Sequence, residues 1–257
     1  MAVRPVFEPR SAAGIQGNQL ADYARHMSPD RYLTELASSL DRLGVLARQP
    51  EDLLTRPVPA CPDWTLKDLF GHLGSIERWA AEIVLSGKFV EESAPPATGA
   101  VTWFLEGTDA FLGTMAALDP EKPCWNFGPP PRKAGFWRRR QAHEHAVHLI
   151  DAYQASGLAV PSFAEDFMLD GIDEILTMFT PRQLRLGRMP QPEGAVTFQV
   201  PGDRRWKVGQ GSAEASITAP LHGMYLGLWG RSSLVETAII EGDKDLAVRV
   251  LQGPLTP

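Results

Sequence analysis

Two long segments near the start of the chain place apolar side chains at helical spacing. The first runs from about 29 to 48, with Ser28 as the N-cap, a proline at the first helical position and leucines every three or four residues. The second begins after Thr65, which can cap the helix together with Asp68, and Gly87 closes it. Both patterns predict amphipathic helices that share a core.

Two further helices are expected before residue 160. One covers about 101–118 and stops at an Asp-Pro pair. The stretch 127–135 contains three consecutive prolines and can only be a loop. The next helix follows that loop and ends near Ser156, before a glycine. Together, the four helices predict a bundle.

The pattern changes after Pro161 from long helical periods to short alternating segments. We expect a helix at 162–179, strands at 195–200, 205–209 and 213–218, a helix at 221–229, a strand at 235–240 and a last helix at 243–251. The predicted fold class is α+β. Its parts are an N-terminal extension at 1–27, a helical bundle at 28–160 and a smaller C-terminal α/β domain at 161–257.

Composition limits the partners of this chain. Its 257 residues are 44% hydrophobic and carry a formal net charge of -6, with a pI near 5.5. This acidic balance argues against nucleic acid or an anionic membrane as the main partner. The N-terminal residues have no apolar signal-peptide core, and no run approaches the ~18 apolar residues of a membrane span. We therefore expect a cytoplasmic protein.

Two cysteines, Cys61 and Cys124, are too few for a disulfide framework in a chain of this length. Small buried thiols are the expected state of both. The sequence does not place either thiol where it would act as a nucleophile.

The stretch from Trp137 to Asp151 carries the strongest chemical signal. At about 100° per residue, Glu144 and His148 lie one helical turn apart on the same side, where a carboxylate and an imidazole can bind a cation. His143 and His145 point about 100° to either side, so they belong elsewhere. The same stripe also holds Trp137, Gln141 and Asp151.

A third ligand is available on the second helix. His72 sits on or beside its apolar side, and a catalytic zinc typically has three protein ligands and one open position. Two other interpretations stay open: His72 as a satisfied core histidine, and Glu144 with His148 as a solvated pair on a helix that packs by its opposite face. That opposite face is the apolar strip of Ala142, Ala146, Leu149 and Tyr153. A zincin protease is excluded, because its second histidine would have to stand where Val147 stands.

Segments 58–73 and 139–152 resemble the mycothiol-dependent maleylpyruvate isomerase family, and 220–231 resembles the helix of its small C-terminal domain. The resemblance implies an N-terminal DinB-like four-helix bundle. It also implies that His72, Glu144 and His148 bind a divalent metal, with zinc as the expected ion. Mycothiol is the implied thiol cosubstrate, and Arg231 is the implied contribution of the C-terminal domain.

The expected activity follows from these groups. A bound zinc favours the deprotonated form of a thiol at its open position, and the activated thiol can attack a small electrophile. We rank mycothiol S-transfer or thiol exchange ahead of cis-trans isomerisation of the maleylpyruvate type. A metal-dependent hydrolase and a non-catalytic ligand-binding or regulatory module are the other candidates.

Three neighbouring side chains have weaker assignments. Arg231 is expected to pair with a substrate carboxylate, or else to stabilise the end of its own helix. Asp151 is expected to orient His148 or to pair on the surface. Arg140 either meets a substrate anion or is surface charge.

Overall fold

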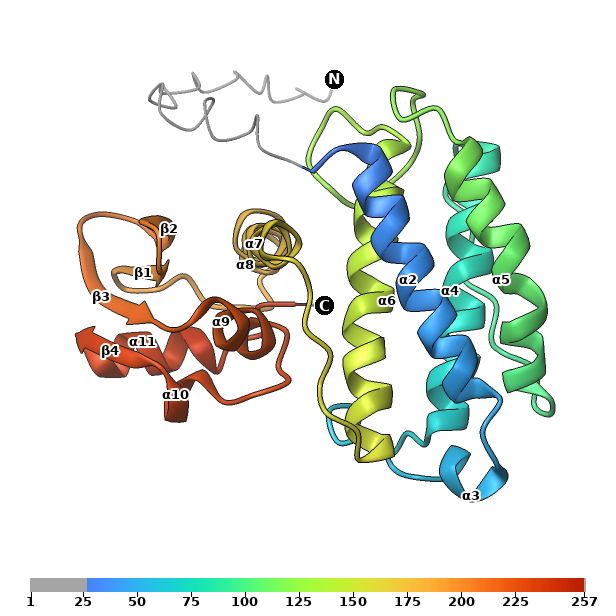
Figure 1. Cartoon of the computed structure of the whole chain (residues 1–257). Helices are drawn as coiled ribbons and strands as arrows, with labels where there is room; N and C mark the ends of the chain where they lie inside the picture. Colours follow the sequence, from blue (N-terminus) through green and yellow to red (C-terminus); the bar gives the residue numbers. More distant parts are fainter. Residues whose placement is uncertain (1–26, 257) are drawn as a thin grey trace, which may run out of the picture.

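Four long helices form the N-terminal part of the chain in a computed structural model that describes residues 27–256 (Figure 1). The extension expected at 1–27 lies, apart from Met27, outside the described residues. The bundle comprises α2 (Pro29–Ala47), the short α3 (Glu51–Leu54), α4 (Leu66–Ser86), α5 (Ala100–Ala117) and α6 (Gly135–Ser156). The four long helices confirm the prediction, whereas α3 was not predicted.

Local capping explains where the bundle helices begin and end. Ser28 caps α2, and its first residue is a proline. Thr65 and Asp68 cap α4 reciprocally, with the Asp68 carboxylate accepting a hydrogen bond from the Thr65 amide at 2.8 Å. Gly87 and Gly157 end α4 and α6 in the left-handed conformation, with φ of 72° and 73°.

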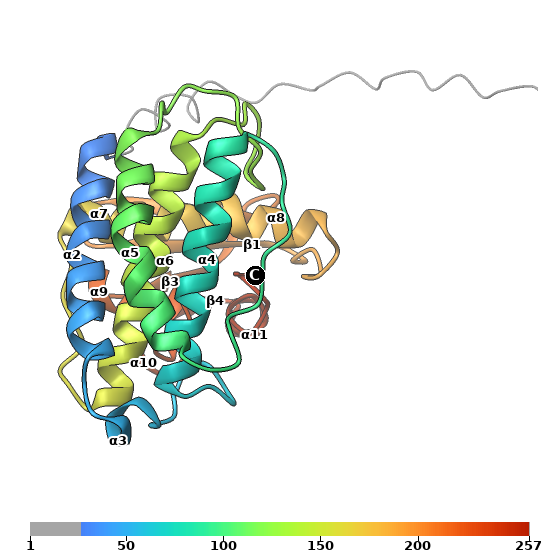
Figure 2. The same cartoon turned by 90° about the vertical axis from the view of Figure 1, so that its right-hand side faces the viewer.

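Helices α4 and α5 run parallel, because the segment that joins them returns along α4 (Figure 2). On this return path the Trp79 indole donates to the carbonyl oxygen of Val90, and Ser75 donates to that of Ser93. Helix α6 runs opposite to α4 and packs against both α4 and α2. This arrangement places the middle of α6 next to the middle of α4.

The C-terminal part is a four-stranded sheet with short helices (Figure 1). Its strand order is β2-β1-β3-β4, in which β1 and β3 are parallel and the other pairs antiparallel. Alternating burial along β1 turns Val196, Phe198 and Val200 toward the core, and α11 covers β1 and β3. Its elements are α7 (Glu165–Asp173), η2 (Glu174–Phe179), α8 (Thr180–Arg185), β1 (Ala195–Val200), β2 (Arg204–Gly209), β3 (Ala213–Thr218), α9 (Leu221–Leu228), α10 (Leu234–Thr237), β4 (Ile239–Gly242) and α11 (Lys244–Leu251). The architecture confirms the predicted α+β class.

Two C-terminal predictions were wrong in detail. The strand expected at 235–240 begins later, at Ile239, because the Ser233 side chain caps a helical turn at Leu234–Thr237. The helix expected at 162–179 starts at Glu165, continues to Arg185, and contains the π-helical segment η2. A π-helical turn interrupts the 3.6-residue period, so apolar spacing did not reveal it.

Helix α6 contacts the C-terminal part, and α2 adds to this contact through Tyr32, whose hydroxyl donates to Asp170 at 2.9 Å. Figure 1 shows α7 and α9 on the side of the bundle that α6 occupies. Polar residues of α6 are buried there, including Arg140, His143 and Asp151. On the charged stripe itself His148 is buried and Glu144 is partly buried, so the alternative in which α6 shows this pair to water is wrong. No helix between residues 27 and 256 combines the length and apolar character needed to cross a bilayer.

Candidate metal centre between the two domains

His72 of α4 meets Glu144 and His148 of α6 at one point. Oε1 of Glu144 lies 3.3 Å from Nε2 of His72 and 3.3 Å from Nε2 of His148. One ligand atom from each residue lies within 4.8 Å of the other two. Two imidazole nitrogens and one carboxylate oxygen are a donor set that suits zinc and leaves one position open. These residues therefore fit a divalent ion.

Asp151 holds His148 in the orientation that this set requires. Its Oδ2 lies 2.9 Å from Nδ1 of His148, so the Nε2 atom is left to face Glu144 and His72. Asp151 is fully buried. A carboxylate on the second nitrogen of a histidine ligand is the common arrangement in metal sites. The orienting role expected for Asp151 agrees with this geometry.

Glu144 and His148 both favour the charged state. Burial disfavours ionised Glu144, yet hydrogen bonds from His148 and His72 and the charge of Arg140 outweigh it and hold its pKa well below the usual range. Burial likewise disfavours protonated His148, but Asp151 and Glu144 raise its pKa to about 9. A metal at this site must displace that proton, since only the neutral imidazole is a ligand.

Arg231 reaches the bundle from the loop after α9. Its Nε and Nη2 atoms donate to the two oxygens of Asp151, at 2.8 and 2.5 Å, and Nη1 donates to the carbonyl oxygen of Trp229. The expected reach across the domain boundary is present, with Asp151 as the carboxylate partner. Pairing of Arg231 with a substrate carboxylate stays a prediction.

Arg140 is neither surface charge nor free for a substrate anion. It is 3% exposed, its Nη2 lies 3.1 Å from Oε2 of Glu144, and its Nη1 pairs with Glu174 of η2. The sequence could not reveal this, because Glu174 lies in another domain.

The other polar residues of α6 lie outside the centre, as helical spacing predicted. His143 pairs with Asp170 of α7 at 2.8 Å. His145 lies 3.2 Å from Glu77 of α4, and its Nδ1 contacts the carbonyl oxygen of Gln141. These contacts join α6 to its neighbouring helices. Neither histidine therefore belongs to the set of His72, Glu144 and His148, which is called the trio below.

Trp64 is a site residue that sequence reasoning missed. Its ring centroid lies 4.9 Å from that of His72 and 6.2 Å from that of His148. The aromatic face therefore packs against both histidines, His72 and His148. Its position immediately before the cap of α4 indicated only a packing role, and its place within the family motif at 58–73 was the one available signal.

Cys61 is closer to the centre than expected. Its thiol lies 3.8 Å from Oδ2 of Asp151, and it is only partly buried. Burial, together with the Asp151 charge, raises the pKa of the Cys61 thiol to about 11. Burial also raises the pKa of Cys124. Neither pKa shift favours a thiolate near neutral pH.

We predict that Cys61 alkylates slowly at pH 7. Because its raised pKa leaves a small thiolate fraction, the rate should rise about tenfold per pH unit from pH 7 to 9, and level off only near pH 11. Iodoacetamide labelling followed by mass spectrometry measures this rate, with Cys61→Ser identifying the labelled site. A rate that is fast and flat above pH 7 would contradict the assignment.

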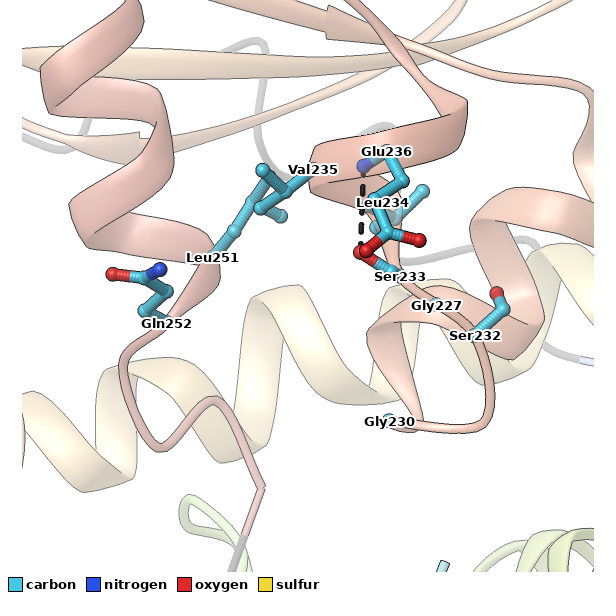
Figure 3. Close-up of a pocket in the computed structure, with 9 residues that line it drawn as sticks. All are labelled: Gly227, Gly230, Ser232, Ser233, Leu234, Val235, Glu236, Leu251 and Gln252. Atoms are coloured by element: carbon cyan, nitrogen blue, oxygen red, sulfur yellow. Dashed lines mark hydrogen bonds between the residues drawn. The ribbon is translucent and has the colours of Figure 1, made fainter.

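A separate surface pocket lies in the C-terminal domain between α9, α10 and the end of α11 (Figure 3). Its volume is about 370 Å³, and its lining is Gly227, Gly230, Ser232, Ser233, Leu234, Val235, Glu236, Leu251 and Gln252. None of the trio contributes to it, and Glu236 is its single ionisable lining residue. The chemistry is therefore assigned to the converging donor atoms and not to this pocket.

Comparison with known families matches both parts of the chain. The family described as the mycothiol maleylpyruvate isomerase N-terminal domain matches residues 33–153. The family described as the MDMPI C-terminal domain matches residues 166–249. No curated protein sequence matches the chain.

Two solved structures have the same fold. One is a crystal structure of the mycothiol-dependent maleylpyruvate isomerase, with 12% sequence identity and a TM-score of 0.56. The other is a histidine-to-alanine mutant of that enzyme, with 12% identity and a TM-score of 0.55. Each alignment covers 84% of this chain and 93% of the solved chain. At this identity the likeness concerns the fold.

Proposed function

The chain belongs to the mycothiol maleylpyruvate isomerase family, and we propose that it is a mycothiol-dependent cis-trans isomerase with a divalent metal, zinc by preference. The observation that carries the proposal is the convergence of His72, Glu144 and His148 at one point. Membership in a family of enzymes disfavours the non-catalytic module. It also reverses our ranking, so that isomerisation now precedes S-transfer.

The charges around the centre suit a cation with an anionic sulfur. Three carboxylates, from Glu144, Asp151 and Glu174, face the guanidinium groups of Arg140 and Arg231. With neutral histidines this group has a net charge of minus one. A divalent cation and one thiolate together neutralise it, which favours a thiolate over a neutral ligand in a partly buried site.

A metal held by this trio supplies Lewis acidity, which lowers the pKa of a thiol or water at the open position. The residues of the chain would hold and orient the groups that react. Glu144 and the two histidines fix the position at which the sulfur acts, and Asp151 fixes the ring of His148. The Cys61 thiol contacts Asp151, and its pKa is raised; both observations support a thiol supplied by an exogenous molecule.

Isomerisation needs the thiol only as a catalyst. In a cis alkene conjugated to a carbonyl group, the sulfur forms a bond to one alkene carbon while the electron pair moves to the carbonyl oxygen. The former double bond then rotates. Return of the electron pair restores the alkene in its trans form and expels the same thiolate, so atoms and electrons balance. An S-transferase would instead keep the new carbon–sulfur bond.

Thiol stoichiometry therefore tests the proposal. Metal-loaded protein is mixed with maleylpyruvate and a small amount of mycothiol, and both substrate isomers and free thiol are measured. We expect many turnovers with constant thiol. Loss of one thiol per substrate would indicate S-transfer, and loss of substrate without thiol and without formation of the trans isomer would indicate a hydrolase. Bound metal with no turnover of maleylpyruvate at any thiol concentration would reject the isomerase proposal.

A further inference from the structure

Arg140 lies between two carboxylates that come from different domains. Its Nη2 donates to Oε2 of Glu144 at 3.1 Å, and its Nη1 donates to Oε2 of Glu174. The two oxygens of Glu144 thus face opposite ways: Oε1 toward the two histidines, and Oε2 toward Arg140. This division keeps one oxygen of Glu144 available to a metal.

The environment of Arg140 confines its guanidinium group. The rings of Phe179 and Trp229 lie 5.1 Å from it, and its side chain is 4% exposed. The Glu174 side chain is 1% exposed. Among the described residues, the other oxygen of Glu174 has no hydrogen-bond partner, so Glu174 is held by its contact with Arg140. A buried guanidinium with two carboxylate partners divides its hydrogen bonds between them.

The π-helical segment η2 provides Glu174 at its first position. The segment follows α7, which is itself tied to α6 through Asp170 and His143. Glu174 therefore reaches Arg140 only when the C-terminal domain is docked on α6. Single π-helical turns are frequent at functional sites.

We propose that Glu174 is a positioning residue for the metal ligand Glu144, so that the docked C-terminal domain raises the metal affinity of the bundle. This inference rests on the proposed metal centre. Without the charge of Glu174, the fork of Arg140 is free to pair with both oxygens of Glu144. Such a bidentate pair engages Oε1, the oxygen that faces His72 and His148, and competes with the metal.

The test compares Glu174→Gln with Glu77→Gln in the full-length protein. Glu77 is the matched control, because it is also fully buried and has a single side-chain partner, His145, outside the trio. Zinc affinity is measured by competition with a chromophoric chelator, and cobalt substitution reports the ligand geometry in the visible spectrum. We expect about 10- to 100-fold weaker zinc binding and an altered cobalt spectrum for Glu174→Gln, and near wild-type values for Glu77→Gln.

Two further variants separate positioning from loss of structure. Adding Arg140→Gln to Glu174→Gln removes the competing guanidinium and should recover part of the zinc affinity, which a purely structural defect would not do. If Glu174→Gln does not fold, Glu174→Asp keeps the charge and should bind zinc more tightly than Glu174→Ala. Wild-type affinity and spectrum in Glu174→Gln would overturn this inference alone. Failure of the wild-type protein to bind zinc or cobalt would instead overturn the metal centre and with it the proposed function.

Discussion

Replacing His148 with alanine is expected to remove the bound metal and to reduce turnover to the level of the metal-free protein. His148 supplies one of only two imidazole nitrogens in the trio, and its Nε2 faces Glu144 at 3.3 Å. Losing a residue that only orients a ligand costs about 10- to 100-fold in metal affinity. Losing one of three ligands costs more, so we expect the metal affinity to fall by on the order of a thousandfold. Metal analysis after gel filtration and the thiol-dependent isomerase assay measure both effects.

The matched control for this variant is His222→Ala. His222 is a half-buried histidine of α9, and it is not one of the residues that converge on the centre. The His222→Ala variant should keep metal content and turnover within about twofold of wild type, which is the effect expected for a substitution away from the site. If His148→Ala retained a full equivalent of metal, the assignment of the centre would be wrong. Because the helix continues on both sides of His148, circular dichroism should show a folded protein.

Asp151→Asn and Arg231→Lys are expected to have large effects that do not add. Arg231 forms a bidentate pair with Asp151, and Asp151 orients His148, so the three residues form one chain of contacts. A lysine at position 231 cannot form the bidentate contact with Asp151. An asparagine at position 151 removes the negative charge that pairs with Arg231. We expect each single variant to lower turnover by about 10- to 100-fold, and the double variant to be little worse than the poorer single one.

A split between KM and kcat tests the substrate role predicted for Arg231. If its guanidinium also binds a substrate carboxylate, Arg231→Lys should raise KM more than Asp151→Asn does. Arg138→Lys is the control, because Arg138 is another buried arginine of α6 and its contacts are with backbone oxygens at the end of α5. Independent, additive losses in the double variant would show that Arg231 does not act through Asp151.

The parts of this structure that sequence predicted well are those encoded locally. Ser28, Thr65 and Gly87 mark helix ends by short-range hydrogen bonds or backbone conformation, and they were placed correctly. The pattern of residues along β1 likewise predicted both ends of this strand, Ala195 and Val200. The meeting of Glu144 and His148 needed only the helical period, but bringing His72 to them required the family motif, because two helices can pack in many registers.

Long-range contacts account for what was missed. The partner of Arg140 is 34 residues away along the chain and belongs to the other domain, so no local pattern could identify it. The contact between Cys61 and Asp151 was missed because the two residues are 90 positions apart along the chain. The π-helical segment was missed because it departs from the 3.6-residue spacing on which the helix prediction rests. The turn at Leu234–Thr237 was missed because it is only four residues long and depends on the Ser233 cap.

The ionic contacts across the domain boundary also constrain how such proteins can be recombined. A bundle cut from its C-terminal half would keep Arg139 and Arg140 on α6 while losing the carboxylates of Asp170 and Glu174 that neutralise them. A chimera with a foreign C-terminal half would need a carboxylate that pairs with Arg140 and a cationic side chain that pairs with Asp151. Shuffling the halves of distant relatives is therefore expected to yield active enzymes only when these two charges are transplanted as well.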